Sequence, residues 1–547
     1  MVPEQVSKLL ELEDKLAKIR AQSSSKLENQ KHIAIILAAV EENINEQDAT
    51  NKNIVNYLIS FMSLLDQTID PETTAIKDLQ LATSTMYLLD IIFQYTPKKM
   101  LRSRFADILT KVAPCITDEK ANAPLIRSAV GCLESLLIAQ DTQSWNNTQN
   151  LKVTPKRGLD GLLELSLDPR PKVRKRAQDA IANILKNPPP GPTAEHVAAP
   201  SISEFAINAL VSLVSILEEA ATISNKKLRA MGGSNELNSR IIHVLKLLSN
   251  IIATNQWPTV HVERLCDLLL EVGKTSDQFL VSNSFKCFET LFQSMAESSV
   301  SSGLAENKFM KALEVIFSLK PSQNDTHLAG AWIAVVAKGI TTYAIHDPLK
   351  CFVKLPEIFR TLSYYLSSEL PDVYSSAAQC LIAIVTDAVK SEILLFPPAV
   401  SAEQYETVDD VIQELSEIFV DLLSIKYTHC AKSVLSILAA AFKKLRYRAN
   451  PDFLKPLEIV GGWRTDERNF LDLRNETEYV IGAAVESMGV ETVLGCLPLN
   501  LINHSLSKPG RAWLLPILRD SIKNSTLHTF FTEFLPLIKN FESKYDK

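Results

Sequence analysis

Apolar residues recur at every third or fourth position along much of the chain, a spacing that predicts amphipathic helices. In the sequence DPRPKVRKRAQDAIANI, which begins at Asp168, four apolar residues fall on one helical face: Val173, Ala177, Ala180 and Ile184. Pro171 stands at the start of this predicted helix, where its missing N–H group costs nothing. The two alanines are small, so we expect a neighbouring helix to approach closely on this face.

The same register returns elsewhere in the chain. It starts again at Pro124, Gln278 and Pro371, and more faintly at Thr428. The intervals between successive starts correspond to one, two, two and one units of about 47–57 residues, which is the length of a HEAT repeat with loop insertions. The pattern also resembles the second helix of a HEAT repeat. Because one such helical pair cannot bury its apolar face alone, we expect an all-α fold, an α-solenoid of HEAT/armadillo-like helical repeats.

One position of the register requires a small side chain between helices. Ala180, Cys287 and Cys380 occupy it, and we expect all three to be buried.

The chain has only 16 glycines in 547 residues, well below the typical share of about 7%, which also disfavours sheet-rich folds.

Proline-rich stretches interrupt the helical pattern. The sequence KNPPPGPTAEHVAAP at 186–200 predicts a connector at 188–200, between HEAT-like repeats at 1–187 and continuing repeats of the same solenoid at 201–547. Two further stretches, 229–236 and 396–410, are also expected to be long loops.

The sequence carries no recognisable catalytic motif. It lacks a P-loop, a G-x-G-x-x-G loop after a strand, a G-x-S-x-G elbow and an H-E-x-x-H pair. The eight cysteines show no metal-ligand spacing, and His32 and His243 read as packed helix residues. The longest apolar runs fall short of the ~20 residues that span a bilayer. We therefore expect a non-enzymatic protein with no cofactor, metal, small-molecule substrate or membrane.

The segment that begins at Asp168 is strongly basic, although the whole chain has a net charge of −6. On a helical wheel, Lys172, Lys175 and Arg176 point away from the apolar stripe, so they are candidate contacts to RNA phosphates. An ordinary solvated helix face explains them equally well. Arg174 flanks the stripe, and we expect it to form a structural inter-repeat pair with Asp168 or with an acid of a neighbouring repeat.

A second basic cluster, FKKLRYRANP, covers 442–451. Lys443, Lys444 and Arg448 surround Tyr447, which is expected to point outward, where an unpaired RNA base can stack on it. Cations at a helix C-terminus also favourably oppose the helix dipole, which is the alternative explanation.

Several motifs together resemble the ribosomal RNA processing protein 12 family of HEAT/armadillo-type nucleolar factors. They are LTKVAPCITDEKANAPLIRSAVGCLESLL, LLELSLDPRPKVRKRAQDAI and GRAWLLPILRDSIKN, and the similarity extends from LELEDKLAKIR at 10–20 to the last residues. Members of that family are longer, so this chain resembles their N-terminal part.

The resemblance implies a non-enzymatic scaffold of pre-ribosomal particles in the nucleus and nucleolus, with shuttling to the cytoplasm. Its implied partners are pre-ribosomal RNA and ribosome assembly factors, and in the family they extend to the Ran GTPase and nucleoporins. The implied roles are rRNA processing, subunit maturation and nuclear export. Two alternatives remain at this point: a karyopherin-like nuclear transport receptor and a regulatory scaffold subunit of an enzyme.

Overall fold

The computed structural model describes residues 3–47, 53–147, 153–191, 193–222, 233–297, 306–466, 468–502, 505 and 508–545. Within these residues the fold is all-α, as predicted, and β-structure is limited to two isolated bridges, Ile69–Ile76 and Ser505–Lys508. The chain divides into two compact units, and the division falls inside α15 (Val262–Gly273), between Leu268 and Leu269.

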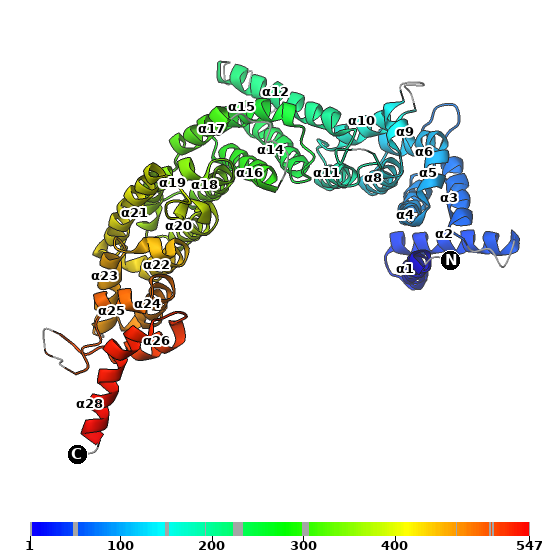
Figure 1. Cartoon of the computed structure of the whole chain (residues 1–547). Coiled ribbons are helices and arrows are strands. Elements are labelled where there is room, and N and C mark those ends of the chain that lie inside the picture. Colours follow the sequence, from blue (N-terminus) through cyan, green and yellow to red (C-terminus); the bar gives the residue numbers. More distant parts are fainter. Residues whose placement is uncertain are drawn as a thin grey trace. The chain divides into compact units, whose positions relative to one another are not determined.

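The first unit consists of two layers of helices (Figure 1). Successive helices of one layer, here called the B helices, pack against each other in chain order: α2 (Glu28–Gln47), α4 (Leu79–Tyr95), α8 (Ala123–Ile138), α11 (Pro171–Lys186) and α14 (Gly233–Ile252). The A helices form the other layer: α1 (Pro3–Arg20), α3 (Ile54–Thr68), α5 (Lys98–Ser103), α6 (Phe105–Val112), α7 (Pro114–Thr117), α10 (Pro155–Leu165) and α12 (Ala199–Thr222). The short α9 (Thr142–Asn146) precedes α10.

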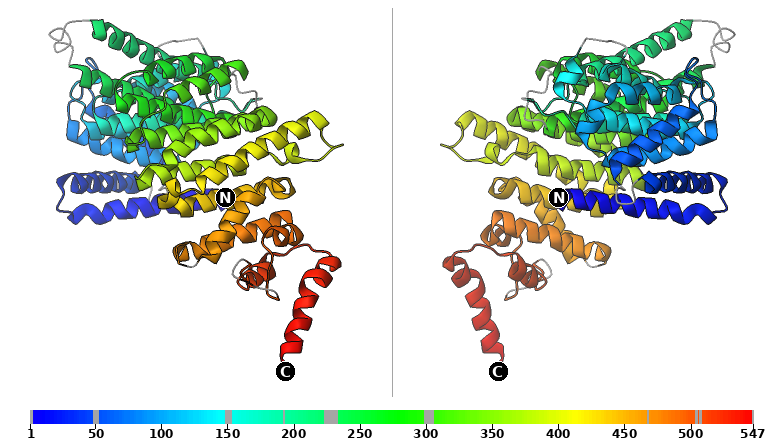
Figure 2. Two further views of the ribbon diagram at one scale, coloured as in Figure 1. Left: turned by 90° about the vertical axis from the view of Figure 1, so that its left-hand side faces the viewer. Right: turned by 90° about the vertical axis from the view of Figure 1, so that its right-hand side faces the viewer.

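The second unit repeats this arrangement. Its B helices are α16 (Gln278–Glu297), α18 (Thr326–His346), α20 (Pro371–Ala383), α22 (Ala431–Leu445), α24 (Arg474–Met488) and α26 (Leu514–Ser521). Its A helices are α17 (Glu306–Ser318), α19 (Pro348–Leu366), α21 (Ala402–Leu422), α23 (Leu454–Thr465) and α25 (Val490–Cys496). The unit ends with α27 (Leu527–Thr529) and α28 (Leu535–Tyr545), and α28 projects away from the B helices (Figure 2).

Local sequence explains where many helices begin. Short polar side chains accept a hydrogen bond from the backbone N–H three residues on, as Asn122 does at α8 and Asp325 does at α18. Proline occupies the first turn of α8, α10, α11, α19 and α20, where it removes no helical hydrogen bond.

The predicted repeat register is confirmed. The starts at 124, 171, 278 and 371 lie in the first turn of the B helices α8, α11, α16 and α20, and the faint start at Thr428 lies just before α22. One B helix, α14 or α18, lies in each interval that was interpreted as two units. Ala180, Cys287 and Cys380 are buried as expected, at 0%, 1% and 5% exposure.

The loop predictions are only partly correct. Residues 187–198 contain no helix where they are described, and α12 begins at Ala199, inside the stretch 188–200 that is predicted to be a connector. Residues 229–232 lie outside the described residues, and the last four residues of 229–236 already belong to α14. The prediction of a loop over 396–410 is wrong beyond Ser401, because α21 begins at Ala402.

Two helices, α12 and α18, are long and apolar enough to cross a membrane by length and composition alone. The apolar surface of α18 is used inside the second unit, where the helix packs against α16 and α20. Its Trp332 is fully buried and donates a hydrogen bond from Nε1 to the carbonyl oxygen of Ile316, at 2.7 Å. Burial of this kind explains the composition of α18 without a bilayer.

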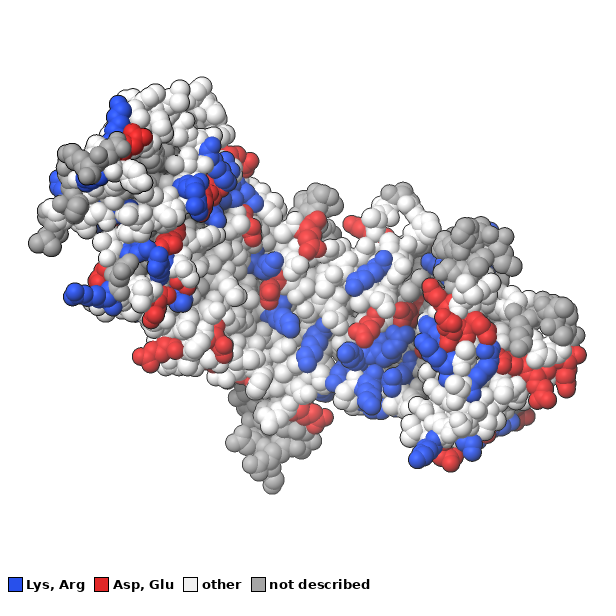
Figure 3. Space-filling view, turned by 90° about the horizontal axis from the view of Figure 1, so that it is seen from below, with Lys and Arg blue, Asp and Glu red and all other residues white. Residues whose placement is uncertain are grey.

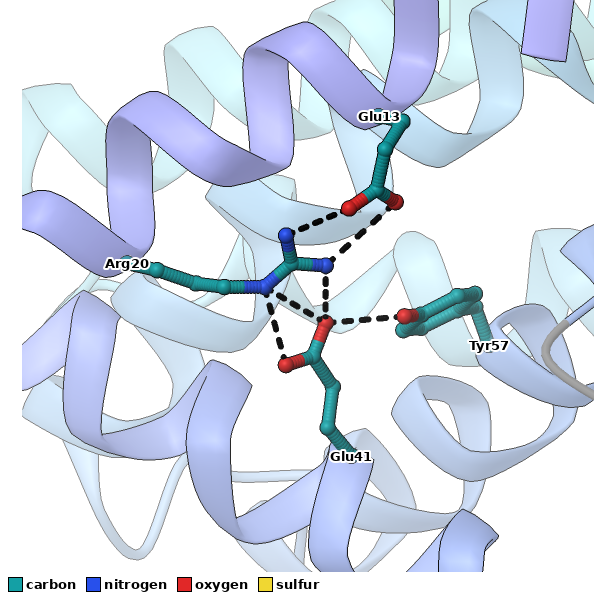
Figure 4. Close-up of polar contacts among 4 residues, drawn as sticks. All are labelled: Glu13, Arg20, Glu41 and Tyr57. Carbon is teal, nitrogen blue, oxygen red and sulfur yellow. Dashed lines mark hydrogen bonds and ion pairs between the residues drawn. The ribbon is translucent and has the colours of Figure 1, made fainter. Parts of the chain in front are cut away.

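A charged network joins the first three helices (Figure 4). Arg20 of α1 donates to both carboxylate oxygens of Glu41 in α2, at 2.7 Å and 3.0 Å, and to Glu13 at 2.6 Å. The Tyr57 hydroxyl of α3 donates to Glu41 at 2.8 Å. Glu41 is only 8% exposed, and burial together with this hydrogen bond raises the pKa of Tyr57. One guanidinium therefore neutralises a buried carboxylate where three helices meet.

Two glycines of α18 are expected to respond oppositely to alanine. A Cβ atom at Gly339 would lie 2.5 Å from Leu313 Cδ2 and 3.2 Å from Phe292 Cε2, whereas a Cβ atom at Gly330 would meet nothing within 4 Å. We expect Gly339→Ala to lower the free energy of unfolding by about 1–2 kcal/mol through overpacking. Gly330→Ala should raise it by up to about 1 kcal/mol through helix propensity. Urea unfolding measures both, and equal effects of the two substitutions would contradict the close packing at Gly339.

Candidate nucleic-acid interface

The basic segment forms the first two turns of α11. Val173, Ala177 and Ala180 are fully buried against the neighbouring helices, which fixes the orientation of the helix about its axis. Lys172 and Lys175 are consequently exposed, and neither has an ion-pair partner among the described residues. The predicted outward orientation of these two lysines is confirmed, while their contact with RNA stays a prediction.

The prediction that Arg176 extends into solvent is wrong. Its side chain lies between α11 and α8. Its Nη1 atom is 2.6 Å from Glu134 Oε2, and Asn183 donates to the other oxygen of the same carboxylate. The wheel position of Arg176 is closer to the apolar stripe than those of the two lysines, so its side chain meets the adjacent helix. Arg176 is therefore half-buried and paired.

The predicted partner of Arg174 is also corrected. Arg174 Nη1 donates to the backbone carbonyl oxygens of Asp168 and Pro169, at 2.7 Å and 3.1 Å, and not to a carboxylate. The Asp168 carboxylate pairs with Arg170 instead, and this hydrogen bond lowers the pKa of Asp168. Arg174 thus holds the turn between α10 and α11 within one repeat. The contact with the preceding repeat is made by Arg170, whose Nη1 atom donates to the Ala121 carbonyl oxygen at 3.3 Å.

The next repeat is joined to α11 by uncharged groups. Gln178 is buried and donates from Nε2 to the carbonyl oxygens of Ser166 and His243, at 3.0 Å and 3.3 Å. Burial, helped by the nearby Arg174 and Lys246, lowers the pKa of His243 to about 4. His243 is therefore neutral near pH 7, as expected of a packed histidine, and the exposed Lys246 continues the run of cations onto α14.

Arg127 of α8 is a further exposed cation that the sequence interpretation did not assign to this surface. Arg127 stands three residues after the proline at the start of its helix, as Arg174 does in α11. The sequence pattern predicts a structural role for an arginine at this position. Its side chain has no ion-pair partner among the described residues. We refer to Arg127, Lys172, Lys175 and Lys246 as the basic face. Figure 3 shows Lys and Arg side chains gathered on one side of the first unit, where Figure 1 places α8 and α11.

The second basic cluster is organised differently from the prediction. Tyr447 is 61% exposed, so its outward position is confirmed. Lys443 donates to the Tyr479 hydroxyl at 2.6 Å and lies over that ring, and Lys444 donates to the Thr386 carbonyl at 2.6 Å. Burial lowers the pKa of Lys444. Both lysines are therefore engaged within the second unit.

The prediction that Arg448 lies on the outside is wrong. Arg448 is 3% exposed, donates to Asp409 Oδ1 at 2.7 Å and stacks on the Tyr405 ring, 3.9 Å from its centroid. The reason is a break in the helix: Arg446 has φ +53°, which ends α22 and shifts the phase of the residues that follow. Arg446 is exposed, as is Lys443, which contacts Tyr479.

Among the described residues, no group of three His, Cys, Asp or Glu side chains could hold a metal ion. Seven of the eight cysteines are buried, and burial raises the pKa of Cys266, Cys351 and Cys380 to about 12, so these thiols stay protonated. What this surface offers is positive charge that can hold an anionic polymer.

Comparison with solved structures gives matches with low TM-scores and low sequence identity. A crystal structure of importin beta aligns with a TM-score of 0.46 and 11% identity, over 92% of this chain and 54% of that one. A structure of Kap121p bound to RanGTP aligns with a TM-score of 0.38 and 11% identity, over 88% of this chain and 52% of that one.

Sequence comparisons are more specific. Ribosomal RNA-processing protein 12 of Saccharomyces cerevisiae is 58% identical over 550 residues, which cover 100% of this chain and 44% of that protein. The human RRP12-like protein is 26% identical over 524 residues, which cover 94% of this chain and 37% of that protein. The chain thus spans less than half the length of these relatives.

Two family descriptions match the chain directly. The family "RRP12-like, N-terminal HEAT repeats" matches residues 3–295, and the family "Ribosomal RNA-processing protein 12, HEAT repeats" matches residues 367–547. The first match alone covers more than half of the chain, and the expected family resemblance is confirmed. The chain belongs to the ribosomal RNA-processing protein 12 family.

Proposed function

We propose that this chain is a non-enzymatic scaffold that binds pre-ribosomal RNA through the basic face of its first unit and supports rRNA processing. The observation that carries the proposal is the basic face itself: exposed cations from three consecutive B helices, in a family whose members are named for rRNA processing. Assembly factors would occupy other repeats, and subunit maturation and nuclear export in the nucleus and nucleolus would follow from assembly on this scaffold.

The distribution of charge supports an electrostatic contact with RNA. The chain as a whole is mildly acidic, at −6, yet α11 carries five Lys or Arg residues and a single acid, Asp179. Neighbouring packed helices lie about 8–10 Å apart, so the long cationic side chains of α8, α11 and α14 can contact phosphates along one strand. Phosphate contacts of this type position RNA without reading its sequence.

The cations of the basic face are available for such contacts. Arg127, Lys172 and Lys175 are exposed and lack ion-pair partners among the described residues, so RNA need not displace an acid to reach them. Arg176 differs, because its guanidinium is held by Glu134. In the second unit, Tyr447 and Arg446 are exposed. Contact of RNA with Tyr447, Lys443 and Lys444 is a second, weaker part of the proposal.

Neutralising the basic face tests the proposal. In the variant Arg127→Gln, Lys172→Gln, Lys175→Gln, we expect the affinity for a single-stranded segment of pre-ribosomal RNA to fall by about 10- to 100-fold near 0.1 M salt. The slope of log K against log salt should flatten by up to about one unit per lost phosphate contact. Exposed substitutions usually change stability by no more than about 0.5 kcal/mol each, so the fold should persist.

A matched control removes the same charge elsewhere in the first unit. Lys98, Lys99 and Arg104 are exposed residues in and just after α5, in the A layer, and their triple Gln variant should bind RNA nearly as well as the parent. An equal loss of RNA affinity in both triple variants would mean that only net charge matters, and no loss in either would reject the basic face as an RNA-binding surface.

Crosslinking of RNA to the protein in cells, followed by purification, should recover rRNA precursors attached to α8 and α11.

A further inference from the structure

A hollow lies beside the basic face, on the exposed side of the B helices of the first unit. It encloses about 570 Å³ and is lined by residues of α2, α4, α8 and α11 together with Asn122, which caps α8. Its size falls in the range of small-ligand sites, about 300–1,000 Å³. Arg127 of the basic face lines it, so a strand lying on that face would pass its opening.

One side of the hollow is aromatic. Tyr87 of α4 lines it, is 42% exposed, and stacks on no other ring among the described residues. The nearby Ser84 and Ser128 are buried polar residues, and Ser84 Oγ lies 2.7 Å from His32 Nδ1. A flat ring beside hydrogen-bonding groups is the environment that a splayed nucleobase requires.

A carboxylate also lines the hollow. Asp90 lines it, and its Oδ1 atom is buried without a hydrogen-bond partner. The carboxylate fits there only because α8 has a glycine opposite: a Cβ atom at Gly131 would lie 2.0 Å from Asp90 Oδ1. A mid-helix glycine costs about 1 kcal/mol relative to alanine, so the sequence maintains room for this carboxylate at an expense in helix stability.

Charged groups of both signs line the hollow. Arg127 is exposed and has no ion-pair partner among the described residues, whereas Arg176 is held by Glu134. The Asp90 carboxylate is more buried, and Arg176 lies close enough to oppose the rise in its pKa. A ligand that fits this arrangement must be anionic where it meets Arg127 and must carry hydrogen-bond donors where it meets the Asp90 carboxylate.

We propose that this hollow binds one unpaired nucleotide of a single-stranded RNA, with its base on the Tyr87 ring, its amino group directed to Asp90 and its phosphate at Arg127. The inference rests on the proposed function and gives it a base-contacting site. Adenine, cytosine and guanine carry an exocyclic amino group. Uracil offers only an N3–H group flanked by two carbonyl oxygens, which the carboxylate repels, so the site disfavours uridine.

Charge separates this ligand from a peptide. The side chains of an acidic peptide would be repelled by the Asp90 carboxylate. Those of a basic peptide would be repelled by Arg127 and the adjacent lysines of the basic face. A nucleotide has an anionic phosphate and a donor-bearing base, which can meet Arg127 and Asp90 separately.

The test compares RNA binding by the full chain and its variants. The probes are single-stranded oligoadenylate, oligocytidylate and oligouridylate of equal length. We expect oligouridylate to bind the parent more weakly than the other two. Tyr87→Ala should weaken oligoadenylate binding by about 5- to 50-fold, because stacking on an aromatic side chain is the interaction removed. Tyr87→Phe should retain the affinity, and Tyr545→Ala controls for removal of an exposed tyrosine.

Salt dependence separates this site from the basic face. Tyr87→Ala should leave the salt slope unchanged because no phosphate contact is lost, whereas the triple Gln variant should flatten it. Asp90→Asn should reduce the preference for oligoadenylate over oligouridylate. AMP alone should compete weakly, because it lacks the neighbouring phosphates, and competition by AMP as strong as that of the strand would overturn the assignment to RNA.

Failure of the inference and failure of the proposed function give different results. If the chain binds all three oligonucleotides equally and Tyr87→Ala binds like the parent, while the triple Gln variant loses affinity, the nucleotide site is rejected and the basic face stands. If no variant changes a measurable affinity, or the parent binds no RNA, the proposed function itself fails. If Tyr87→Ala loses its helical circular dichroism signal, the same RNA-binding measurements are made with Tyr87→Leu. Leucine retains the apolar bulk needed for folding but has no aromatic face on which a base can stack.

Discussion

Arg20→Ala is expected to lower the free energy of unfolding of the first unit by about 2–4 kcal/mol. Arg20 donates hydrogen bonds to both oxygens of the Glu41 carboxylate, and Glu41 is 8% exposed. Removing one partner of a buried ion pair typically costs about 3–5 kcal/mol, because the other charge is left uncompensated. The Arg20 side chain is 31% exposed, and solvent that enters its place should reduce the cost.

Two further variants identify the cause of that loss. Glu13→Ala removes the exposed partner of Arg20 and should cost no more than about 1 kcal/mol. Adding Glu41→Gln to Arg20→Ala should recover part of the stability, because no buried charge then remains. Urea unfolding followed by circular dichroism measures all three. A loss in Glu13→Ala as large as that in Arg20→Ala would show that the outer pair, and not the buried carboxylate, carries the energy.

The repeat architecture could be predicted because it depends on local periodicity. Each B helix must bury one stripe of side chains, so residues such as Val173 and Ala177 return with the helical period wherever a repeat occurs. The register also predicted the burial of Cys287 and Cys380, since the position between two packed helices excludes any large side chain.

The loop predicted at 396–410 shows how a local signal was overlooked. The proline pair and the acidic residues that follow suggested a long loop. The stretch S-A-E-Q at 401–404 is instead a helix start: the Ser401 hydroxyl accepts a hydrogen bond from the backbone N–H of Gln404, at 3.1 Å. Ser three residues before Gln is a capping-box pattern, so this start was readable from the sequence.

The side-chain partners of the basic clusters could not be read in the same way. The helical wheel placed Arg448 outside because it assumed that α22 continues, whereas the chain turns at Arg446 and Arg448 meets Asp409, 39 residues earlier. Arg176 similarly finds Glu134 on the preceding repeat. The hollow beside the basic face combines residues from 29 to 176, and no spacing within one repeat predicts it.

The pH dependence of stability provides a test of the carboxylate inside that hollow. Burial, together with the nearby Glu134, raises the pKa of Asp90 to about 6, against the opposing effects of Arg176, Gln94 and Lys15. The native state therefore binds a proton at Asp90 more readily than the unfolded chain does. Above pH 6 the ionised carboxylate destabilises the fold, and the destabilisation diminishes as the pH falls from about 6 towards 4.

Asp90→Asn should accordingly be more stable than the parent at pH 7–8, by about 1–3 kcal/mol, since a pKa that is higher by about 2 corresponds to at most about 3 kcal/mol. The advantage should shrink steadily below pH 6 and be nearly absent at pH 4. Thermal unfolding across pH 4–8 measures it, with Asp179→Asn, an exposed acid on α11, as the control for loss of one carboxylate. A variant that is less stable than the parent at pH 8 would show that the Asp90 carboxylate is held by attractive contacts. If the predicted gain is found together with a loss of base preference in RNA binding, then Asp90 is a residue whose charge lowers stability and serves recognition.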